Sequence, residues 1–318
     1  MSKVYRLNEA VRQFIHDGDE ICFGGFTTTR KPYAIIYEIL RQEIKDLILD
    51  GGPAGGDTDL LVGAERVKVL NNTYCGNSGI TNVCRRFRKA IEEGSILFED
   101  YSLDAQALMF HAGALGLQYI PIRYMLGSSL ETEWGISREV RRTIDKLPDE
   151  KLIVSENPFS PGEKTMLVPA LNPDVAVIHA QKASPEGIVR IEGSRFVDLD
   201  MAMSAKRCIV SCEELVTDEE LRRDPGANTL PGFVTTAVVV APHGSHPSQC
   251  YNYFDQDLAF YQEYDAASKT KEDFLAFLDK WVYGVKNHEE YLDKLGATRL
   301  EKLHVTKGLG FVSRRKQA

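Results

Sequence analysis

Short apolar runs alternate with stretches of helical periodicity along most of the chain. Runs rich in apolar and β-branched residues predict strands at 20–23, 47–49, 67–70, 96–98, 175–179, 208–212 and 234–240. Apolar positions spaced as on one helix face predict helices over 7–14, 32–42, 81–91 and 103–115. The later strand runs are continuously apolar, as in strands buried on both faces. The pattern predicts an α/β fold with an open, mostly parallel sheet flanked by helices on both sides.

The chain is predicted to form one domain. No internal repeat, low-complexity tract or long Pro/Gly/Ser-rich linker divides the 318 residues. We therefore expect a single domain over residues 1–318, with a helical C-terminal appendage at about 265–300.

Three polar loops follow predicted strands and mark the expected site. They cover 24–31, 51–57 and 75–81, and Asp57 is placed to cap the helix after the second loop. Parallel sheets bind ligands beyond the carboxyl ends of their strands, so these loops are expected at one edge. The first loop lies within DGDEICFGGFTTTRKP. Its backbone is uncovered at Gly24 and Gly25, and it also contains three threonines and two cationic residues.

The loops admit more than one chemical interpretation. Glycine lets backbone N–H groups approach an anion, so the first two loops are either phosphate cradles or tight turns, and neither matches a known phosphate fingerprint. Arg30 and Lys31 either meet a substrate carboxylate or form a solvated pair. Ser78, in Asn77-Ser78-Gly79, lacks the G-x-S-x-G pattern of an exposed nucleophile, so we expect it to hydrogen bond a ligand.

Two further groups of residues could bind a ligand or a partner, but each has a simpler structural interpretation. His243, His246 and Cys250 have a spacing that a metal ion can use, but the prolines and glycine among them favour a turn. The basic run over 85–89 lies on the outward side of a predicted helix, where a solvated or partner-facing surface is the default.

The block Ser155-Glu156-Asn157 is also not expected to be catalytic. A Ser-Glu-Asn block carries the catalytic glutamate in one enzyme family, but here proline follows where that block has glycine. We predict a surface turn instead.

Composition and charge exclude several classes of protein. A formal net charge of −8 and a pI near 5.5 give no field that attracts nucleic acid or anionic lipid. The N-terminal stretch lacks the apolar segment of a signal peptide, and no apolar run approaches the roughly 20 residues of a membrane span. We therefore expect a cytoplasmic protein that binds neither nucleic acid nor membrane. Six scattered cysteines do not make a disulfide framework, so free thiols packed as small hydrophobes are expected.

Seven segments carry a family resemblance that covers nearly the whole chain. In order they are DGDEICFGGFTTTRKP, GGPAGGD, NSGITNVCRRFRK, LGSSLETEWGIS, AVIHAQKASPEGIVRI, AVVVAPHGSHPSQCY and LDKLGATRL. Together they resemble the A (alpha) subunits of the class I CoA-transferases, including those that act on glutaconate. The signature of these subunits reads acid-Gly, an apolar triplet, Gly-Gly-Phe and then Gly-x-Pro. This sequence departs from it at Cys22, in the triplet, and at Arg30, where the signature has glycine.

The resemblance implies an active site shared between two chains. A glutamate of the partner, the B subunit, attacks the acyl-CoA thioester and becomes a glutamyl-CoA thioester, so no catalytic residue is expected in this chain. The implied reaction moves CoA between acetyl-CoA and a short dicarboxylate such as glutaconate. CoA thioester is then substrate, no cofactor or metal is expected, and assembly is a dimer or tetramer of heterodimers. The expected substrate-binding residues are Gly24, Gly25, Phe26, Thr27, Thr28, Arg30, Ser78 and Gly79.

Two alternatives remain open from the sequence. Many relatives carry a glutamine near the reacting carbonyl in the segment 100–103, whereas this chain has none before Gln106. That departure allows a CoA-thioester hydrolase or decarboxylase subunit on the same two-chain fold. A regulatory, ligand-binding domain that is stable alone is the third hypothesis.

Overall fold

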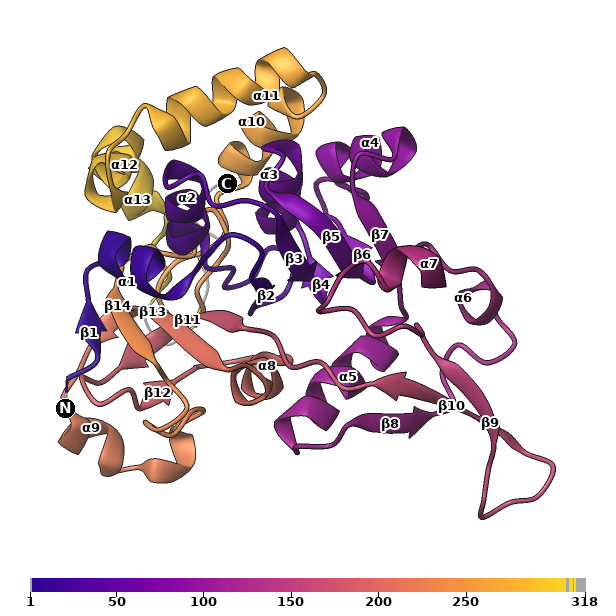
Figure 1. The fold of residues 1–318 in the computed structure, drawn as a ribbon. Coiled ribbons are helices and arrows are strands. Elements are labelled where there is room, and N and C mark those ends of the chain that lie inside the picture. The colour runs from indigo at the N-terminus through magenta and orange to yellow at the C-terminus, as the bar shows by residue number, and fades with distance from the viewer. Residues whose placement is uncertain (1, 307–308, 311, 313–318) are drawn as a thin grey trace.

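A parallel sheet forms the centre of the molecule (Figure 1). The computed structural model describes residues 2–306, 309–310 and 312, so the ends of the predicted 1–318 domain lie outside the described residues. The strand order is β1-β14-β13-β11-β2-β3-β5-β7, and each neighbouring pair on this path is parallel. The predicted fold class is confirmed. The bounds are β1 Val4–Tyr5, β2 Glu20–Phe23, β3 Leu47–Asp50, β5 Val67–Asn72, β7 Leu97–Asp100, β11 Val175–Ala183, β13 Arg207–Leu215 and β14 Ala237–Val240, with the antiparallel β12 Val189–Arg190 beside β11.

The sheet grows in two directions from β2. The chain first adds β3, β5 and β7 on one side of β2, and later places β11, β13 and β14 on the other side. Open α/β sheets bind ligands at such a switch point, beyond the carboxyl ends of the strands. The topology therefore puts the loop after β2, which contains the glycine pair, at the centre of the expected site.

Helices cover both faces of the sheet, and alternate strand residues enter two separate cores. Ile21 and Phe23 of β2 pack into the core under the first set of helices, whereas Cys22 between them enters the other core. In Figure 1, α2 and α3 lie above the strands and α5 and α8 below them. The first set is α1 Leu7–Phe14, α2 Tyr33–Arg41, α3 Gly56–Gly63 and α4 Arg85–Glu93, and the second is α5 Leu103–Ala114 and α8 Asp198–Ser204.

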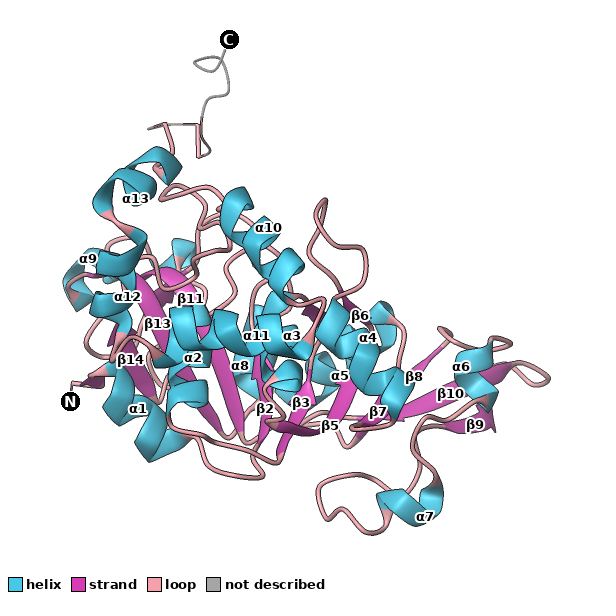
Figure 2. Cartoon of the chain, turned by 90° about the horizontal axis from the view of Figure 1, so that it is seen from above, coloured by secondary structure: helices cyan, strands magenta, loops and turns pink. Residues whose placement is uncertain are grey.

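The helical C-terminal region predicted at about 265–300 is present and is packed into the main core. Phe260, Phe277 and Trp281 belong to one buried cluster with residues of α2 and α3, and α11 lies above these helices in Figure 1 and over them in the view of Figure 2. This region is therefore a layer over the sheet helices. No described helix has the length and apolar character to cross a bilayer. The region comprises α10 Leu258–Ala267, α11 Lys271–Leu278, the π-helical turn Asp279–Tyr283, α12 His288–Leu295 and α13 Ala297–Leu303.

The middle of the chain forms a small antiparallel sheet that the sequence did not predict. Strand β10 pairs with both β8 and β9, and the turn between β9 and β10 contains the exposed Phe159. Ser155 and Glu156 are exposed, as expected, but they belong to strand β9, so the surface turn predicted at 155–157 begins only at Asn157. The remaining elements are β4 Pro53–Ala54, β6 Tyr74–Cys75, β8 Tyr119–Ile122, α6 Ser129–Thr132, α7 Arg138–Arg141, β9 Ile153–Glu156, β10 Lys164–Pro169, α9 Asp218–Arg222 and the 3₁₀ turn Pro225–Ala227.

Most predicted elements differ from the structure by a few residues at most, but one boundary is wrong for a clear reason. The helix predicted over 81–91 begins at Arg85. Thr81 is held outside it, because its Oγ1 donates a 2.6 Å hydrogen bond to Asp265 Oδ1 and its backbone pairs with Asn77. A partner distant in sequence thus sets where this helix starts.

The burial of α11 gives a direct test of the C-terminal layer. Phe277→Ala is expected to lower the free energy of unfolding by about 3–5 kcal/mol, because this 4 % exposed ring fills the shared core. Leu275→Ala, on the same helix but 44 % exposed, should change it by about 0.5 kcal/mol. Urea denaturation followed by circular dichroism measures both. Equal small losses would contradict the placement of α11.

Candidate active-site wall

The three predicted loops meet at one edge of the sheet. They follow β2, β3 and the β5–β6 segment, and β2, β3 and β5 are neighbours. Thr27 N–H donates to Pro53 O (3.0 Å), which joins the first loop to the second. Gly56 N–H donates to Asn77 Oδ1 (2.8 Å), and the hydroxyls of Thr27 and Ser78 lie 2.9 Å apart. The structure thus brings the three loops into one continuous wall.

The glycine pair after β2 is needed for close packing. Gly25 has φ +80°, and a Cβ there would lie 2.4 Å from Thr29 O. At Gly24 a Cβ would lie 2.1 Å from Asp198 Oδ1. Any larger residue at either position would have to displace this backbone or this carboxylate.

The N–H groups of the glycine loops are already used inside the chain. Gly24 N–H donates to Val177 O (2.9 Å) and Gly25 N–H to Asp198 Oδ1 (2.8 Å). These loops are therefore tight turns, and the phosphate-cradle interpretation is wrong. In the second loop Gly51 donates to Asn71 O, Gly52 to Gln106 Oε1, Gly55 to Asp57 Oδ1 and Gly56 to Asn77 Oδ1.

Arg30 is buried rather than presented to a ligand. Its side chain is 1 % exposed, and Nη2 lies 2.8 Å from Asp198 Oδ2. Nη1 also donates to His179 O (2.7 Å) and Nη2 to Ser194 O (3.0 Å). Neither a solvated position nor an open approach to a substrate carboxylate fits this placement. Its role is to hold the loop, with Asp198 bonded to both Arg30 and Gly25.

Lys31 forms the second buried ion pair of the wall. Its Nζ lies 2.9 Å from Asp57 Oδ2, and both side chains are fully buried. Asp57 is therefore not the helix cap that we predicted: Gly55 is the N-cap of α3, and Asp57 lies within its first turn. The pair joins the first loop to the second from beneath.

The outer surface of the wall carries hydroxyl and aromatic groups. Ser78 and Gly79 are exposed, and a Cβ at Gly79 would meet no atom within 4 Å. Phe26 is half-buried and stacks on Phe196, with ring centroids 5.0 Å apart. Thr27 and Thr28 are buried just behind this surface. Of the predicted residues, Ser78, Gly79 and Phe26 thus lie at the surface of the wall.

The predicted histidine and cysteine group is dispersed by the fold. His246 Nε2 lies 3.1 Å from Asp257 Oδ2, whereas His243 stacks on Phe254 with ring centroids 4.7 Å apart. Burial lowers the pKa of His243 to about 4, so it is uncharged at neutral pH. Cys250 is buried beside His179 and Glu213. The turn predicted over these residues is confirmed.

Two other groups of potential metal donors are buried near the wall. In one, His179 and Glu213 lie beside Cys250, but both ring nitrogens of His179 are already bonded, to Ser211 Oγ at 2.9 Å and to Glu213 Oε1 at 2.7 Å. That group is satisfied without an ion.

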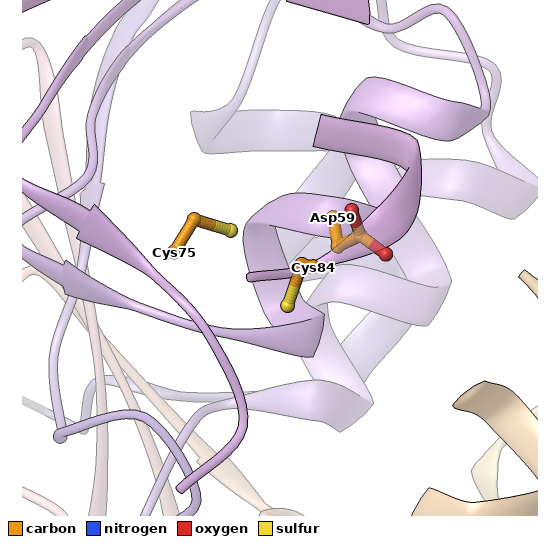
Figure 3. A group of neighbouring side chains, drawn as sticks. All are labelled: Asp59, Cys75 and Cys84. Atoms are coloured by element: carbon orange, nitrogen blue, oxygen red, sulfur yellow. The ribbon is translucent and has the colours of Figure 1, made fainter. Parts of the chain in front are cut away.

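The other donor group consists of Asp59, Cys75 and Cys84 (Figure 3). One donor atom from each lies within 4.8 Å of the others. Burial raises the pKa of Cys75, and the hydrogen bond with Cys75 together with burial raises the pKa of Cys84. Burial raises the pKa of Asp59 to about 6. All six cysteines are free and buried, as predicted.

Comparison with known proteins decides the family. The family model described as Coenzyme A transferase matches residues 4–241. The chain belongs to the coenzyme A transferase family. This CoA-transferase chain is 56% identical over 311 residues to the A subunit of the glutaconate CoA-transferase of Acidaminococcus fermentans, and the match covers 98% of this chain and 97% of the relative. The crystal structure of glutaconate coenzyme A-transferase from the same organism matches with a TM-score of 0.98 and 55% identity, over 100% of both chains.

Other relatives of this CoA-transferase chain are less similar. The A subunit of the 3-oxoadipate CoA-transferase of Pseudomonas knackmussii is 36% identical over 93% of this chain and 99% of its own. The cholesterol ring-cleaving hydrolase IpdA subunit of Rhodococcus jostii is 29% identical over 87% of this chain and 91% of its own. The comparisons thus favour a transferase over the hydrolase alternative.

The departure of this CoA-transferase from the signature at Arg30 has a physical reason. Arg30 has φ +54°, a left-handed conformation that glycine adopts without steric cost. The arginine keeps the turn that the signature's glycine implies, and its buried pairing with Asp198 offsets part of the backbone strain. Asp198 was not among the predicted site residues, although an aspartate with Val197 and Leu199 as its neighbours is a usable signal for a buried partner.

The Arg30–Asp198 pair yields a stability prediction. Asp198→Ala is expected to lower the free energy of unfolding by about 3–5 kcal/mol, because it leaves a buried guanidinium without its counter-charge. Asp200→Ala on the same helix removes a partly exposed carboxylate paired with exposed His111, and should cost less than about 1 kcal/mol. Chemical denaturation of both variants compares the losses. If Asp198→Ala were as mild as its control, the pair would not be holding the turn.

Proposed function

We propose that this chain is the A subunit of a heteromeric CoA-transferase that moves CoA between acetyl-CoA and a short dicarboxylate such as glutaconate. The supporting observation is its 56% identity, over 98% of its length, to a protein named as the A subunit of a glutaconate CoA-transferase. Its agreement in fold with the glutaconate enzyme, at a TM-score of 0.98, supports the same function.

The reaction divides between two chains. A glutamate carboxylate of the partner attacks the thioester carbonyl, the thiolate of CoA leaves, and an acyl-glutamyl anhydride forms. The CoA thiolate then attacks the glutamyl carbonyl of the anhydride, so that the donor carboxylate leaves and a glutamyl-CoA thioester forms. The acceptor carboxylate attacks this thioester and displaces the thiolate, which then attacks the acceptor acyl carbonyl of the new anhydride to give acceptor-CoA and free glutamate. Such intermediates need hydrogen-bond donors for the developing oxyanion and exclusion of water. We assign to this chain the exclusion of water and part of the hydrogen bonding to the oxyanion.

The wall suits that role because its charges are neutralised internally. Arg30 is paired with Asp198 and Lys31 with Asp57, all buried, so the loops present hydroxyls, glycine and an aromatic ring. Ser78 is the exposed donor, and the Thr27 hydroxyl at 2.9 Å helps to orient it. We propose that Ser78 hydrogen bonds the acyl part of the substrate, and that the far carboxylate finds its cation on the partner chain.

An exposed apolar surface beside the wall supports assembly with a partner. On and near α8, Phe196, Leu199 and Met203 are 40%, 37% and 43% exposed. Large apolar side chains grouped next to a site mark interaction surfaces. We propose that the B subunit covers this surface, in a cytoplasmic dimer or tetramer of heterodimers, and that the isolated chain is inactive. This separates the proposal from the regulatory-domain hypothesis, which requires a self-sufficient binding site.

Activity of the assembled pair tests the function. The chain, co-expressed with the B subunit from the neighbouring reading frame, should exchange CoA between acetyl-CoA and glutaconate, whereas neither chain should do so alone. A coupled assay for released acetate, with mass spectrometry of the new thioester, measures the exchange. Hydrolysis without transfer would support the hydrolase alternative, and transfer by the isolated chain would overturn the proposal.

Ser78 can be tested without disturbing the core. Ser78→Ala removes one exposed hydroxyl and should lower kcat/KM by about two- to tenfold, the effect of one hydrogen bond. Unfolding free energy should stay within about 0.5 kcal/mol of the parent. Ser160→Ala, in the β9–β10 turn remote from the wall, is the control and should change neither quantity. Unchanged kinetics in Ser78→Ala would remove this residue from the site.

A further inference from the structure

The Asp59, Cys75 and Cys84 side chains converge beneath the loop that carries Ser78. Asp59 belongs to α3, Cys75 ends β6 and Cys84 immediately precedes α4. Residues 76–83 therefore leave the core at one cysteine and return to it at the other. The Cys84 N–H donates to Cys75 O (2.9 Å), so the two cysteines form the neck of this loop.

The three donors are preorganised and shielded from solvent. Asp59, Cys75 and Cys84 are 0%, 3% and 1% exposed. Asp59 Oδ1 accepts a 2.6 Å bond from the Phe87 N–H, and Oδ2 accepts a 2.6 Å bond from the Tyr264 hydroxyl. Each carboxylate oxygen can accept a second interaction, so both remain able to bind an ion. Hydrogen bonds of this kind commonly fix the orientation of a ligating carboxylate.

The donor set has a definite chemical preference. Two cysteine sulfurs and one carboxylate oxygen are ligands of Zn²⁺ and of similar thiophilic ions, and they do not suit Mg²⁺ or Ca²⁺. The sulfur of Cys75 has only a long 3.5 Å contact to Gly55 O and a hydrogen bond with the thiol of Cys84, which is itself a member of the group. By contrast, His179 in the other donor group has no free ring nitrogen. Asp59, Cys75 and Cys84 are therefore the better-prepared group.

We propose that Asp59, Cys75 and Cys84 bind one divalent thiophilic ion of the zinc class at the neck of the Ser78 loop. On binding, the two S–H bonds break, two protons leave to solvent and two sulfur–metal bonds form, with no change of oxidation state. The carboxylate supplies the third bond, and a water molecule completes a tetrahedral ion. The ion ties α3, β6 and the start of α4 together, and so stiffens the base of the loop.

Metal titration of the purified chain, by itself and in complex with the B subunit, tests the inference. After removal of bound metal by a chelator, Cd²⁺ serves as the probe because its thiolate complexes absorb in the ultraviolet. The expected result is a saturable absorption increase at one ion per copy of this chain, reversed by chelator, and a higher melting temperature. Zn²⁺ should compete with Cd²⁺ for the same site.

Matched variants locate the ion. Cys84→Ser should raise the Kd for Cd²⁺ by roughly tenfold or more. Cys208→Ser, which removes a buried thiol outside the group, should leave stoichiometry and affinity unchanged. Asp59→Asn removes the charged ligand while keeping both sulfurs, and should weaken binding too. Circular dichroism confirms that each variant is folded.

The inference fails on either of two results. One is a folded parent protein that shows no saturable absorption change with Cd²⁺. The other is equal affinity in the parent and in whichever of Cys84→Ser and Asp59→Asn is folded. Because the readout is binding and not CoA transfer, these results are independent of whether the assembled enzyme proves to be a transferase.

Discussion

Two buried ion pairs hold the glycine loops in the form that makes a wall. Arg30 with Asp198 and Lys31 with Asp57 are almost completely removed from water. A buried charge is tolerable only when it is paired and hydrogen bonded, so each cation fixes where its carboxylate must lie. The pairs join α8 and α3 to the loop after β2 from within the core. The two ion pairs therefore both hold the wall in its conformation and leave its surface neutral.

Much of the fold could be predicted because its strands are buried on both faces. Continuous apolar runs such as that in β13 identify parallel strands without knowledge of their partners. The antiparallel strands β9 and β10 could not be found in this way, because only two of their ten residues are buried and their pairing supplies the regularity. The start of α4 was also misplaced, since it depends on a bond from Thr81 to Asp265, 184 residues away.

The site was predictable in location but not in the role of each residue. Loops at the carboxyl ends of adjacent strands must meet, and these do. Whether a cation in such a loop faces solvent, substrate or core depends on a partner that sequence spacing does not reveal, as Asp198 is for Arg30. The same limit applies to Asp59, Cys75 and Cys84, which the fold brings together from three elements. The local sequence was enough to predict the turns. The role of each charged residue depends on its partner in the folded chain.

The core shared by α2, α3 and the C-terminal helices also constrains how the chain is made. On the ribosome, the apolar sides of α2 and α3 emerge early, while Phe260, Phe277 and Trp281, which cover them, are synthesised more than two hundred residues after α2. The nascent chain therefore carries uncovered apolar surface until these later helices have been synthesised.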